Sequence, residues 1–419
     1  MDRKSQALAL NEFVTRFTNM WNDEIMNEYP ESMQHYPKEW LDLLLTLSNE
    51  ELFAIDTKNI NHQVFLKIEN TSLDKFIKEG IALSKIDLKK VEQPIKFEQW
   101  AYNGIKAKKR HEIDRIIPAI NILKNKITIN QVIDIGGGVG HLSRVIAHYA
   151  NIKAISIDRN SEFQKIGKER LKKYRKLPDA KEVEFVNLNF SPKNTAEELK
   201  SIFKVDSLSL GLHTCGPLAN ILIKTSCQHQ LAGILSFGCC YHHLNPKEDF
   251  PISKFYRENQ FSSLNLYAFS LATRSHAQDD FEVFKTKRQV KNYRYALHLF
   301  LMRKFNNKYF QDVGECDVKI YWMPFKHYLK LKLSELKLEN TFTDEEIEAF
   351  YNSKQTQKEL DEMFAGNLIR WLLGRSLEVY LLLDRALYLE ENGYEVFVEE
   401  YFKEALSPRN IGILALFKN

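Results

Sequence analysis

The chain has 419 residues, of which 44% are hydrophobic and 27% are charged. This balance is typical of a folded globular protein and excludes a disordered or fibrous chain. Lysine and arginine outnumber aspartate and glutamate by 59 − 55 = 4, so the charge permits an anionic partner but lacks the large basic excess of a dedicated nucleic-acid-binding module.

Residues 1 to about 95 carry apolar side chains at helical spacing, for example at 8–17 and 40–47. Ser48 followed by Glu51 has the pattern of a capping box at the start of a further helix. We therefore expect an N-terminal helical domain over residues 1–104 that covers the core or grips substrate.

The N-terminal sequence, the apolar runs and the cysteines indicate where in the cell the protein is located. The N-terminus lacks a signal-peptide pattern, and no apolar run approaches membrane-spanning length. Four of the five cysteines lie between residues 215 and 240, and Cys316 stands apart; an odd, clustered count is typical of reduced thiols. We expect a cytoplasmic protein with no membrane partner.

Four basic residues lie between positions 106 and 110, directly before His111 and Glu112 in a predicted helix. Such a cluster is either a solvated helix face or the rim of a site that meets a phosphate or carboxylate. Because it precedes the central strand of the chain, His111 is a candidate cofactor-binding residue.

The central stretch is a predicted strand, 131–135, followed by a glycine-rich turn and a helix. Its β-branched residues suit a strand covered on both faces. Such a turn at a helix N-terminus is a usual cradle for a nucleotide-like cofactor. The G-x-G-x-G spacing differs from the dinucleotide pattern and resembles motif I of S-adenosylmethionine (SAM)-dependent methyltransferases. The candidate cofactor-binding residues here are Asp134, Gly136, Gly138, Gly140, His141 and Leu142.

Two further strands end in polar residues. A strand at 153–158 ends in Asp158, an acid placed to accept hydrogen bonds from ribose hydroxyls. A strand at 183–188 leads to Asn187 and Asn189, which stand where relatives of this fold place an aspartate against adenine. Asparagine can still accept from the adenine amine. We expect SAM as the cofactor.

Strands and helices alternate from residue 131 to residue 237, which predicts a parallel sheet with helices on both faces. Beyond Tyr241 the alternation stops, and we interpret about 245–365 as a helical insertion after strand five. A long helix at 369–391 and a final strand pair follow. The predicted fold is an α/β class I SAM-dependent methyltransferase with a Rossmann-like seven-stranded sheet over 105–419. The remaining predicted elements are helices at 141–150, 162–175 and 195–203 and strands at 207–212, 233–237, 394–398 and 411–417.

Histidine, cysteine and tyrosine side chains follow the fourth and fifth strands of this predicted sheet. Because the carboxyl ends of parallel strands meet at one edge, we expect these side chains to converge on the reaction site. The candidate catalytic residues are His213, Cys215, Cys239, Cys240, Tyr241 and His242, with His243 beside them.

Three chemistries fit these residue types. A histidine or Tyr241 could remove a proton from an attacking hydroxyl or nitrogen. A cysteine could add covalently to a pyrimidine ring, although the Pro-Cys dipeptide of such enzymes is absent. Two histidines and the cysteines could bind zinc, but the usual C-x-x-C spacing is missing, so we expect no metal. Alternatively, Cys239 and Cys240 simply pack as small buried groups.

Six segments of the chain carry a family pattern, at 108–112, 213–216, 238–241, 250–253, 381–389 and 407–410. Together they resemble the methyltransferase-like protein 25 family. One departs slightly, since Ile252 stands where the family has Leu or Met. The strand ends also resemble, more distantly, those of the tRNA acceptor-stem ribose methyltransferases, whose zinc-finger parts are not visible.

The resemblance implies a SAM-dependent methyltransferase. The shared strand ends and the basic cluster lead us to predict RNA (tRNA or rRNA) as the substrate. The absence of an Asn-Pro-Pro-aromatic motif disfavours methylation at adenine N6. The near-neutral charge keeps a protein or small-molecule methyltransferase open as an alternative. The large helical additions keep a non-catalytic SAM-binding scaffold open as well.

Overall fold

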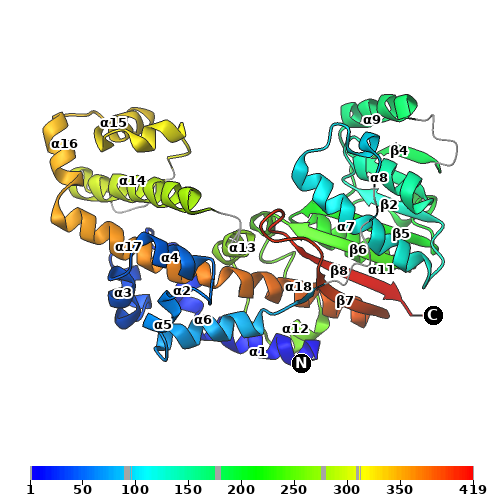
Figure 1. Cartoon of the computed structure of the whole chain (residues 1–419), viewed down its shortest axis with the longest axis horizontal. Helices are drawn as coiled ribbons and strands as arrows, with labels where there is room; N and C mark the ends of the chain where they lie inside the picture. The colour runs from blue at the N-terminus through cyan, green and yellow to red at the C-terminus, as the bar shows by residue number, and fades with distance from the viewer. Residues whose placement is uncertain are drawn as a thin grey trace. The chain divides into compact units, whose positions relative to one another are not determined.

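The computed structural model describes residues 2–88, 95, 97–174, 181–274, 280–307, 311 and 313–418. The chain forms two compact units, whose elements are labelled in Figure 1. Unit 1 comprises Met1–Thr15, Leu83–Gln278 and Arg375–Asn419, and unit 2 comprises Arg16–Ala82 and Asp279–Gly374.

This division differs from the predicted boundaries at 104 and 105 and from an insertion confined to 245–365. Helix α1 (Arg3–Arg16) lies almost wholly in unit 1, whereas most other N-terminal helices join residues 279–374 in unit 2. An amphipathic helix needs a partner for its apolar stripe, and the sequence does not show which distant segment supplies it.

Unit 1 is built on an eight-stranded sheet with the order β1-β7-β8-β6-β5-β2-β3-β4. Strands β4, β3, β2, β5 and β6 are parallel, and β8 runs antiparallel between β6 and β7. The seven predicted strands are therefore present, and β1 adds a short edge parallel to β7. The bounds are β1 (Asp87–Leu88), β2 (Gln131–Ile135), β3 (Lys153–Asp158), β4 (Val183–Asn187), β5 (Ser207–Cys215), β6 (Gly233–Cys239), β7 (Tyr394–Glu400) and β8 (Ile411–Phe417).

Helices follow the strands as the alternation predicts. All five residues of β2 are buried, as expected for a central strand covered on both faces. Helix α8 continues as a π-helical turn over Ile146–Ala150, and the helix predicted to reach Arg175 is described to Tyr174, Arg175 lying outside the described residues. The helices of this part are α7 (Ala107–Lys124), α8 (His141–Val145), α9 (Ser161–Tyr174), α10 (Ala196–Lys200) and α11 (Leu218–Gln228).

The helix predicted at 369–391 is two helices, α17 (Lys354–Leu372) and α18 (Gly374–Glu391). In α18 the buried Asp384 accepts hydrogen bonds from the Ile252 N–H (2.8 Å), the Ser253 N–H (2.9 Å) and the Ser253 hydroxyl (2.6 Å). This links two of the motif segments and anchors α12 (Lys254–Glu258), which precedes α13 (Leu266–Thr273).

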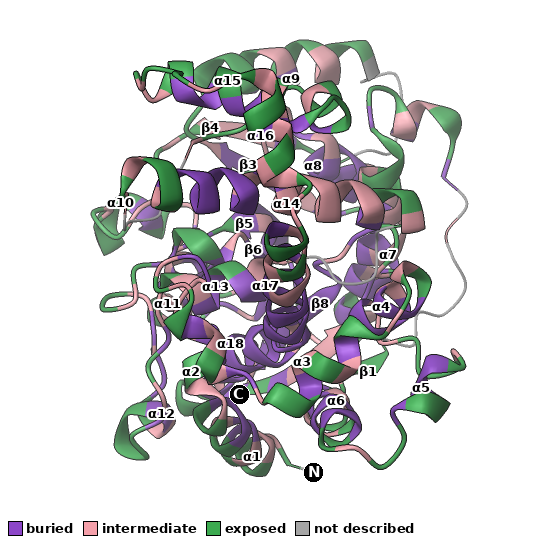
Figure 2. Cartoon of the chain, turned by 90° about the vertical axis from the view of Figure 1, so that its left-hand side faces the viewer, coloured by how far each residue is buried: buried purple, intermediate pink, exposed green. Residues whose placement is uncertain are grey.

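All the secondary structure described within unit 2 is helical. Ser48 and Glu51 form the predicted capping box at α4, with bonds of 2.9 and 3.3 Å. Figure 2 shows α17 as largely buried, and within it the Arg370 side chain lies 2.6 Å from Glu24 Oε2. The helices are α2 (Thr18–Trp21), α3 (Lys38–Leu45), α4 (Asn49–Asp56), α5 (Val64–Lys67), α6 (Ser72–Leu83), α14 (Phe281–Phe305), α15 (Phe325–Glu335), α16 (Asp344–Tyr351) and α17. Within the described residues, no helix combines the length and apolar character needed to cross a bilayer.

Candidate functional site

A pocket of about 400 Å³ lies at the carboxyl ends of the parallel strands in unit 1. Ligands of open α/β sheets bind at this edge, and the volume is that of a small-molecule site. Ile135, Ile157, Leu188, Phe190, Leu218 and Ile221 give it apolar walls, and the other lining residues are Gly136, Asp158, Arg159, Asn189, His213, Cys215 and Pro217.

The glycine turn and Asp158 are joined by hydrogen bonds beside this pocket. The Gly136 N–H donates to the Ile157 carbonyl (2.9 Å), and the Gly138 N–H donates to Asp158 Oδ2 (2.9 Å). Asp158 Oδ1 accepts from the Asn160 N–H (2.8 Å). Each carboxylate oxygen retains a lone pair for a ligand hydroxyl. Gly138 has φ +58°, and a Cβ there would meet no atom within 4 Å, so its backbone is open to a ligand.

Of the predicted residues of the turn, only Gly136 lines the pocket, and Gly138, Gly140, His141 and Leu142 do not. Gly140 has φ +69°, and a Cβ there would lie 2.5 Å from the Phe185 ring, so the position accommodates packing. Leu142 is in the core, and His141 Nε2 lies 3.1 Å from an Arg170 nitrogen. Burial lowers the His141 pKa to about 4. Gly140, His141 and Leu142 support the turn and do not line the pocket.

Asp134 lies beside Gly137 of the glycine turn. Its Oδ2 accepts a hydrogen bond from the Ser143 hydroxyl (2.6 Å), and its burial raises the pKa of the carboxyl. A Cβ at Gly137 would lie 3.0 Å from Asp134 Oδ2 and 2.3 Å from Ser156 Oγ. The carboxyl is therefore bonded to the first turn of α8, and it leaves no room for a side chain at Gly137.

Two other predicted cofactor contacts lie outside the lining. The Asn187 side-chain amide donates to the Asp158 carbonyl (3.0 Å), so it supports the neighbouring strand end, whereas Asn189 does line the pocket. His111 Nε2 accepts from the Lys403 N–H (3.0 Å).

Glu112 lies at the centre of a polar cluster that sequence reasoning noted but did not assign a role. Its side chain is fully buried, and Oε1 lies 2.8 Å from both His213 Nε2 and Ser407 Oγ. Burial by itself would raise the pKa of Glu112, but hydrogen bonding and the charge of His213 outweigh burial, so the pKa is lowered. Residues of three motif segments therefore meet at one carboxylate.

An irregular backbone presents His213 to the pocket. The register between β5 and β6 shifts between Leu212 and Thr214, and His213 adopts φ +64°. A left-handed conformation is uncommon for a residue other than glycine and is typical of functional sites.

The three thiols at the ends of β5 and β6 are in mutual contact. Cys215 Sγ lies 3.3 Å from Cys239 Sγ and 3.4 Å from Cys240 Sγ. Cys215 is exposed, Cys239 is buried and Cys240 is half-buried. The hydrogen bond from Cys239 lowers the pKa of Cys215 to about 5, and that same bond raises the pKa of Cys239.

Tyr241 and His242 lie apart from the pocket lining. Tyr241 is 1% exposed, its hydroxyl lies 3.5 Å from Glu378 Oε1, and burial raises its pKa. Tyr241 therefore lies in the core and does not line the pocket, which differs from its predicted convergence on the reaction site. His242 Nδ1 lies 3.3 Å from Thr273 Oγ1, and its ring centroid is 4.0 Å from that of His243.

Sequence reasoning missed several lining residues. Arg159 directly follows Asp158, so its place in the chain could have indicated it. Leu218 and Ile221 lie three residues apart on the first turn of α11, and that helical spacing after the strand-four motif was the available signal. Leu188 and Phe190 flank Asn189 in the sequence and belong to no motif that would have indicated them.

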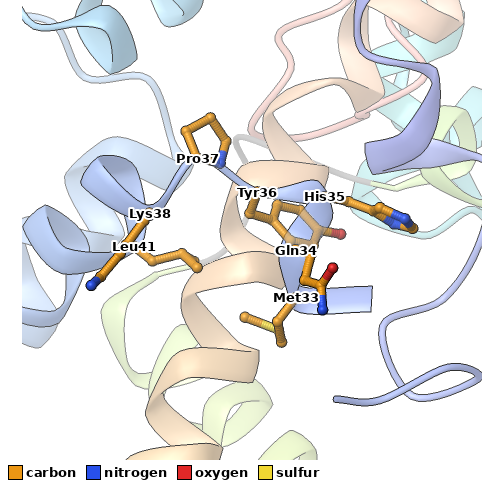
Figure 3. A pocket seen from close by; sticks show the side chains of 7 residues that line it. All are labelled: Met33, Gln34, His35, Tyr36, Pro37, Lys38 and Leu41. Carbon is orange, nitrogen blue, oxygen red and sulfur yellow. The ribbon is translucent and has the colours of Figure 1, made fainter. Parts of the chain in front are cut away.

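A second pocket, of about 590 Å³, lies in unit 2 (Figure 3). Figure 3 shows His35 and Lys38 on opposite sides of it. It offers no glycine turn or convergent acid, so the pocket of unit 1 is the candidate site. The lining residues are Met33, Gln34, His35, Tyr36, Pro37, Lys38 and Leu41.

Comparison with known proteins identifies a methyltransferase domain in this chain. The family model of a methyltransferase domain matches residues 108–247, which include β2 to β6. The chain is 26% identical to the "Probable methyltransferase-like protein 25" of Mus musculus over 239 residues (51% of this chain, 38% of the relative), and 28% identical to that of Homo sapiens over 244 residues (53% and 39%). It thus spans about two fifths of the length of these curated relatives.

Among solved structures, the chain aligns with coclaurine N-methyltransferase bound to N-methylheliamine and SAH, with 12% identity and a TM-score of 0.26 over 91% of this chain and 98% of the other. That superposition is too weak for a comparison of sites. The sequence resemblance to methyltransferase-like protein 25 is confirmed, the chain contains a methyltransferase domain, and the domain supports SAM as the methyl donor.

Proposed function

We propose that this protein is a SAM-dependent methyltransferase that modifies RNA. The observation that carries the proposal is the pocket at the strand ends, which is lined by Gly136 of the glycine turn and Asp158 and also by His213 and Cys215. A cofactor cradle and candidate reacting groups therefore share one cavity.

The residues of the pocket fit SAM. Asp158 would accept hydrogen bonds from the ribose hydroxyls, Asn189 would bind the adenine edge, and the apolar walls suit the flat face of the base. The open backbone at Gly138 lets the cofactor approach closely. When bound, SAM supplies an electrophilic methyl group.

His213 is the residue we propose to move the proton. Its Nε2 is held 2.8 Å from the Glu112 carboxylate, which makes Nε2–H the donor and leaves Nδ1 to accept a proton from an attacking hydroxyl or nitrogen. Glu112 is a positioning residue in this arrangement, because it fixes the tautomer and orientation of the imidazole.

RNA as the substrate is supported by the basic cluster at the start of α7. Lys106, Lys108 and Arg110 are exposed, and Lys108 Nζ lies 3.9 Å from Glu112 Oε1. Lys108 therefore borders the carboxylate that holds His213, and Lys106 and Arg110 lie next to it in the sequence. Exposed lysine and arginine beside a reaction site are suited to phosphate contacts. We also propose a cytoplasmic location, supported by the five free cysteines.

Labelled SAM offered with total cellular RNA and with total cellular protein tests the proposal. We expect wild type to label RNA, in a ribonuclease-sensitive form, and Asp158→Ala to label nothing. Label confined to protein would replace RNA with a protein substrate. SAM binding without transfer to either pool would favour the non-catalytic scaffold.

A further inference from the structure

We propose that Cys215, Cys239 and Cys240 form a binding site for a thiophilic metal ion, Zn²⁺ being the expected occupant. The three sulfur atoms all lie within 4.8 Å of one another. Four tetrahedral ligands about 2.3 Å from Zn²⁺ are separated by about 3.8 Å. The observed separations of 3.3 and 3.4 Å from Cys215 therefore require shifts of only a few tenths of an ångström.

The backbone directs these thiols at one another. The shift between Leu212 and Thr214 brings Cys215 opposite Cys239 in the β5–β6 ladder, whereas an unshifted register would place it opposite Cys240. Cys240 adopts φ +52°, a left-handed conformation that lets adjacent cysteines both face Cys215. Such strain at non-glycine residues persists where the surroundings impose it and is concentrated at functional sites.

The chemistry balances without an oxidant. Three S–H bonds break, three metal–sulfur bonds form, and three protons pass to solvent. Three thiolates leave one tetrahedral position, which a water molecule or substrate atom would take. Cys215 is exposed and lines the cofactor pocket, while Cys239 is buried, so an ion held by these thiols would be reached from the pocket.

The spacing of the cysteines in the sequence predicted no metal site, because C-x-x-C pairs are absent. The three ligands instead come from two neighbouring strand ends. Cys215 and Cys239 are 24 residues apart in the sequence. The inference does not depend on methyl transfer, since metal binding and SAM binding are measured separately.

The test uses the reduced full chain, stripped with a chelator and offered Zn²⁺ alone or Co²⁺ alone. We expect one Zn²⁺ per chain to survive dialysis and Co²⁺ to give sulfur-to-metal charge-transfer absorption. Cys215→Ser, Cys239→Ser and Cys240→Ser should each weaken Zn²⁺ binding at least tenfold. Cys227→Ser and Cys316→Ser are the matched controls and should bind as wild type does.

Thiol mapping in the unmutated chain guards against variants that misfold. Zn²⁺ should protect Cys215, Cys239 and Cys240 from alkylation, with Cys227 and Cys316 reacting as they do without metal. No retained Zn²⁺, or equal retention by a Cys215→Ser/Cys239→Ser variant, would overturn the site. SAM affinity of the stripped protein, measured by calorimetry, separates this failure from a failure of the cofactor assignment.

Discussion

Glu112 Oε1 and Ser407 Oγ lie 2.8 Å apart although 295 residues separate them in the chain. The same oxygen lies 2.8 Å from His213 Nε2. One buried carboxylate therefore joins the start of α7, the end of β5 and the β7–β8 connection. This contact explains why three separate motif segments belong to one site.

We expect Glu112→Gln to slow methyl transfer by about 10–100-fold, the range for a residue that positions a reacting group. The amide can still accept from Ser407, but it no longer fixes the charge and tautomer of His213. Rates would be measured with saturating SAM and the substrate found in the labelling experiment. His213→Ala should lower the rate at least as far. SAM affinity, measured by calorimetry, should stay within about threefold of wild type for both variants.

Glu112→Ala should also destabilise unit 1. Removing the carboxylate leaves the buried Ser407 hydroxyl and the half-buried His213 ring without their shared partner, at about 1–3 kcal/mol in free energy of unfolding. Glu197→Ala is the control, because Glu197 is 85% exposed and makes only a surface pair with Lys200. Equal unfolding midpoints in urea for the two variants would contradict a structural role for the cluster.

Asp158→Asn should weaken SAM binding by about 10–100-fold, because hydrogen bonds to a charged acceptor contribute about 1.5–3 kcal/mol. Its remaining carbonyl oxygen cannot serve both the Gly138 N–H and a ribose hydroxyl as the carboxylate does. Calorimetry of SAM binding provides the measurement, and Asp206→Asn, at the opposite end of the strands, is the control. An unchanged affinity for Asp158→Asn would show that the cofactor lies elsewhere.

The strands and the cofactor turn were predictable because their signals are local. The β-branched run of β2, the glycines and the terminal Asp158 each follow from neighbours in sequence. The role of Glu112 was not predictable, since its partners His213 and Ser407 are 101 and 295 residues away. The convergence of the thiols likewise depends on a register shift that leaves no sequence pattern. Tyr241 was misjudged because its neighbours in sequence are at the site while its side chain points into the core.

Gly140→Ala should destabilise the protein by about 2–4 kcal/mol. A Cβ at this position combines a left-handed backbone, which costs about 1–2 kcal/mol, with overpacking against the Phe185 ring. Gly138→Ala is a close control, since its φ is also positive but the Cβ would meet no atom within 4 Å. Gly138→Ala should destabilise the protein only by the cost of the left-handed backbone, about 1–2 kcal/mol, while it weakens SAM binding. Urea unfolding and calorimetry distinguish the two, and equal destabilisation would contradict the packing argument.

Acidification should destabilise the fold through His141. Its pKa in the folded protein is about 4, lowered by burial and then by Arg144 and Arg170, against about 6.5 in an unfolded chain. Between these values the unfolded state binds more protons, so stability falls as pH drops from 6.5 towards 4. His141→Gln removes this titration, so its Tm should fall less than that of wild type between pH 7 and pH 5, by about 2–4 °C. Parallel Tm curves would show that His141 titrates alike in both states.

The ion pair between Arg370 and Glu24 tests whether residues 16–82 and 279–374 form one unit. Arg370 is 1% exposed, its terminal nitrogen lies 2.6 Å from Glu24 Oε2, and its Nε donates to the Met20 carbonyl (3.0 Å). Arg370→Met should destabilise unit 2 by about 3 kcal/mol, because it leaves the Glu24 carboxylate without its partner. Adding Glu24→Leu should restore much of this loss, since replacing both ions with apolar groups is close to neutral.

Hydrogen exchange resolved by peptide measures this effect within each segment. Arg370→Met should accelerate exchange in α2 as well as in α17, because the side chain ties these two helices together. Lys326→Ala, which removes only the more exposed contact with Asp344, should cost no more than about 1 kcal/mol. If Arg370→Met affects exchange in α17 alone, the N-terminal helices fold independently of residues 279–374.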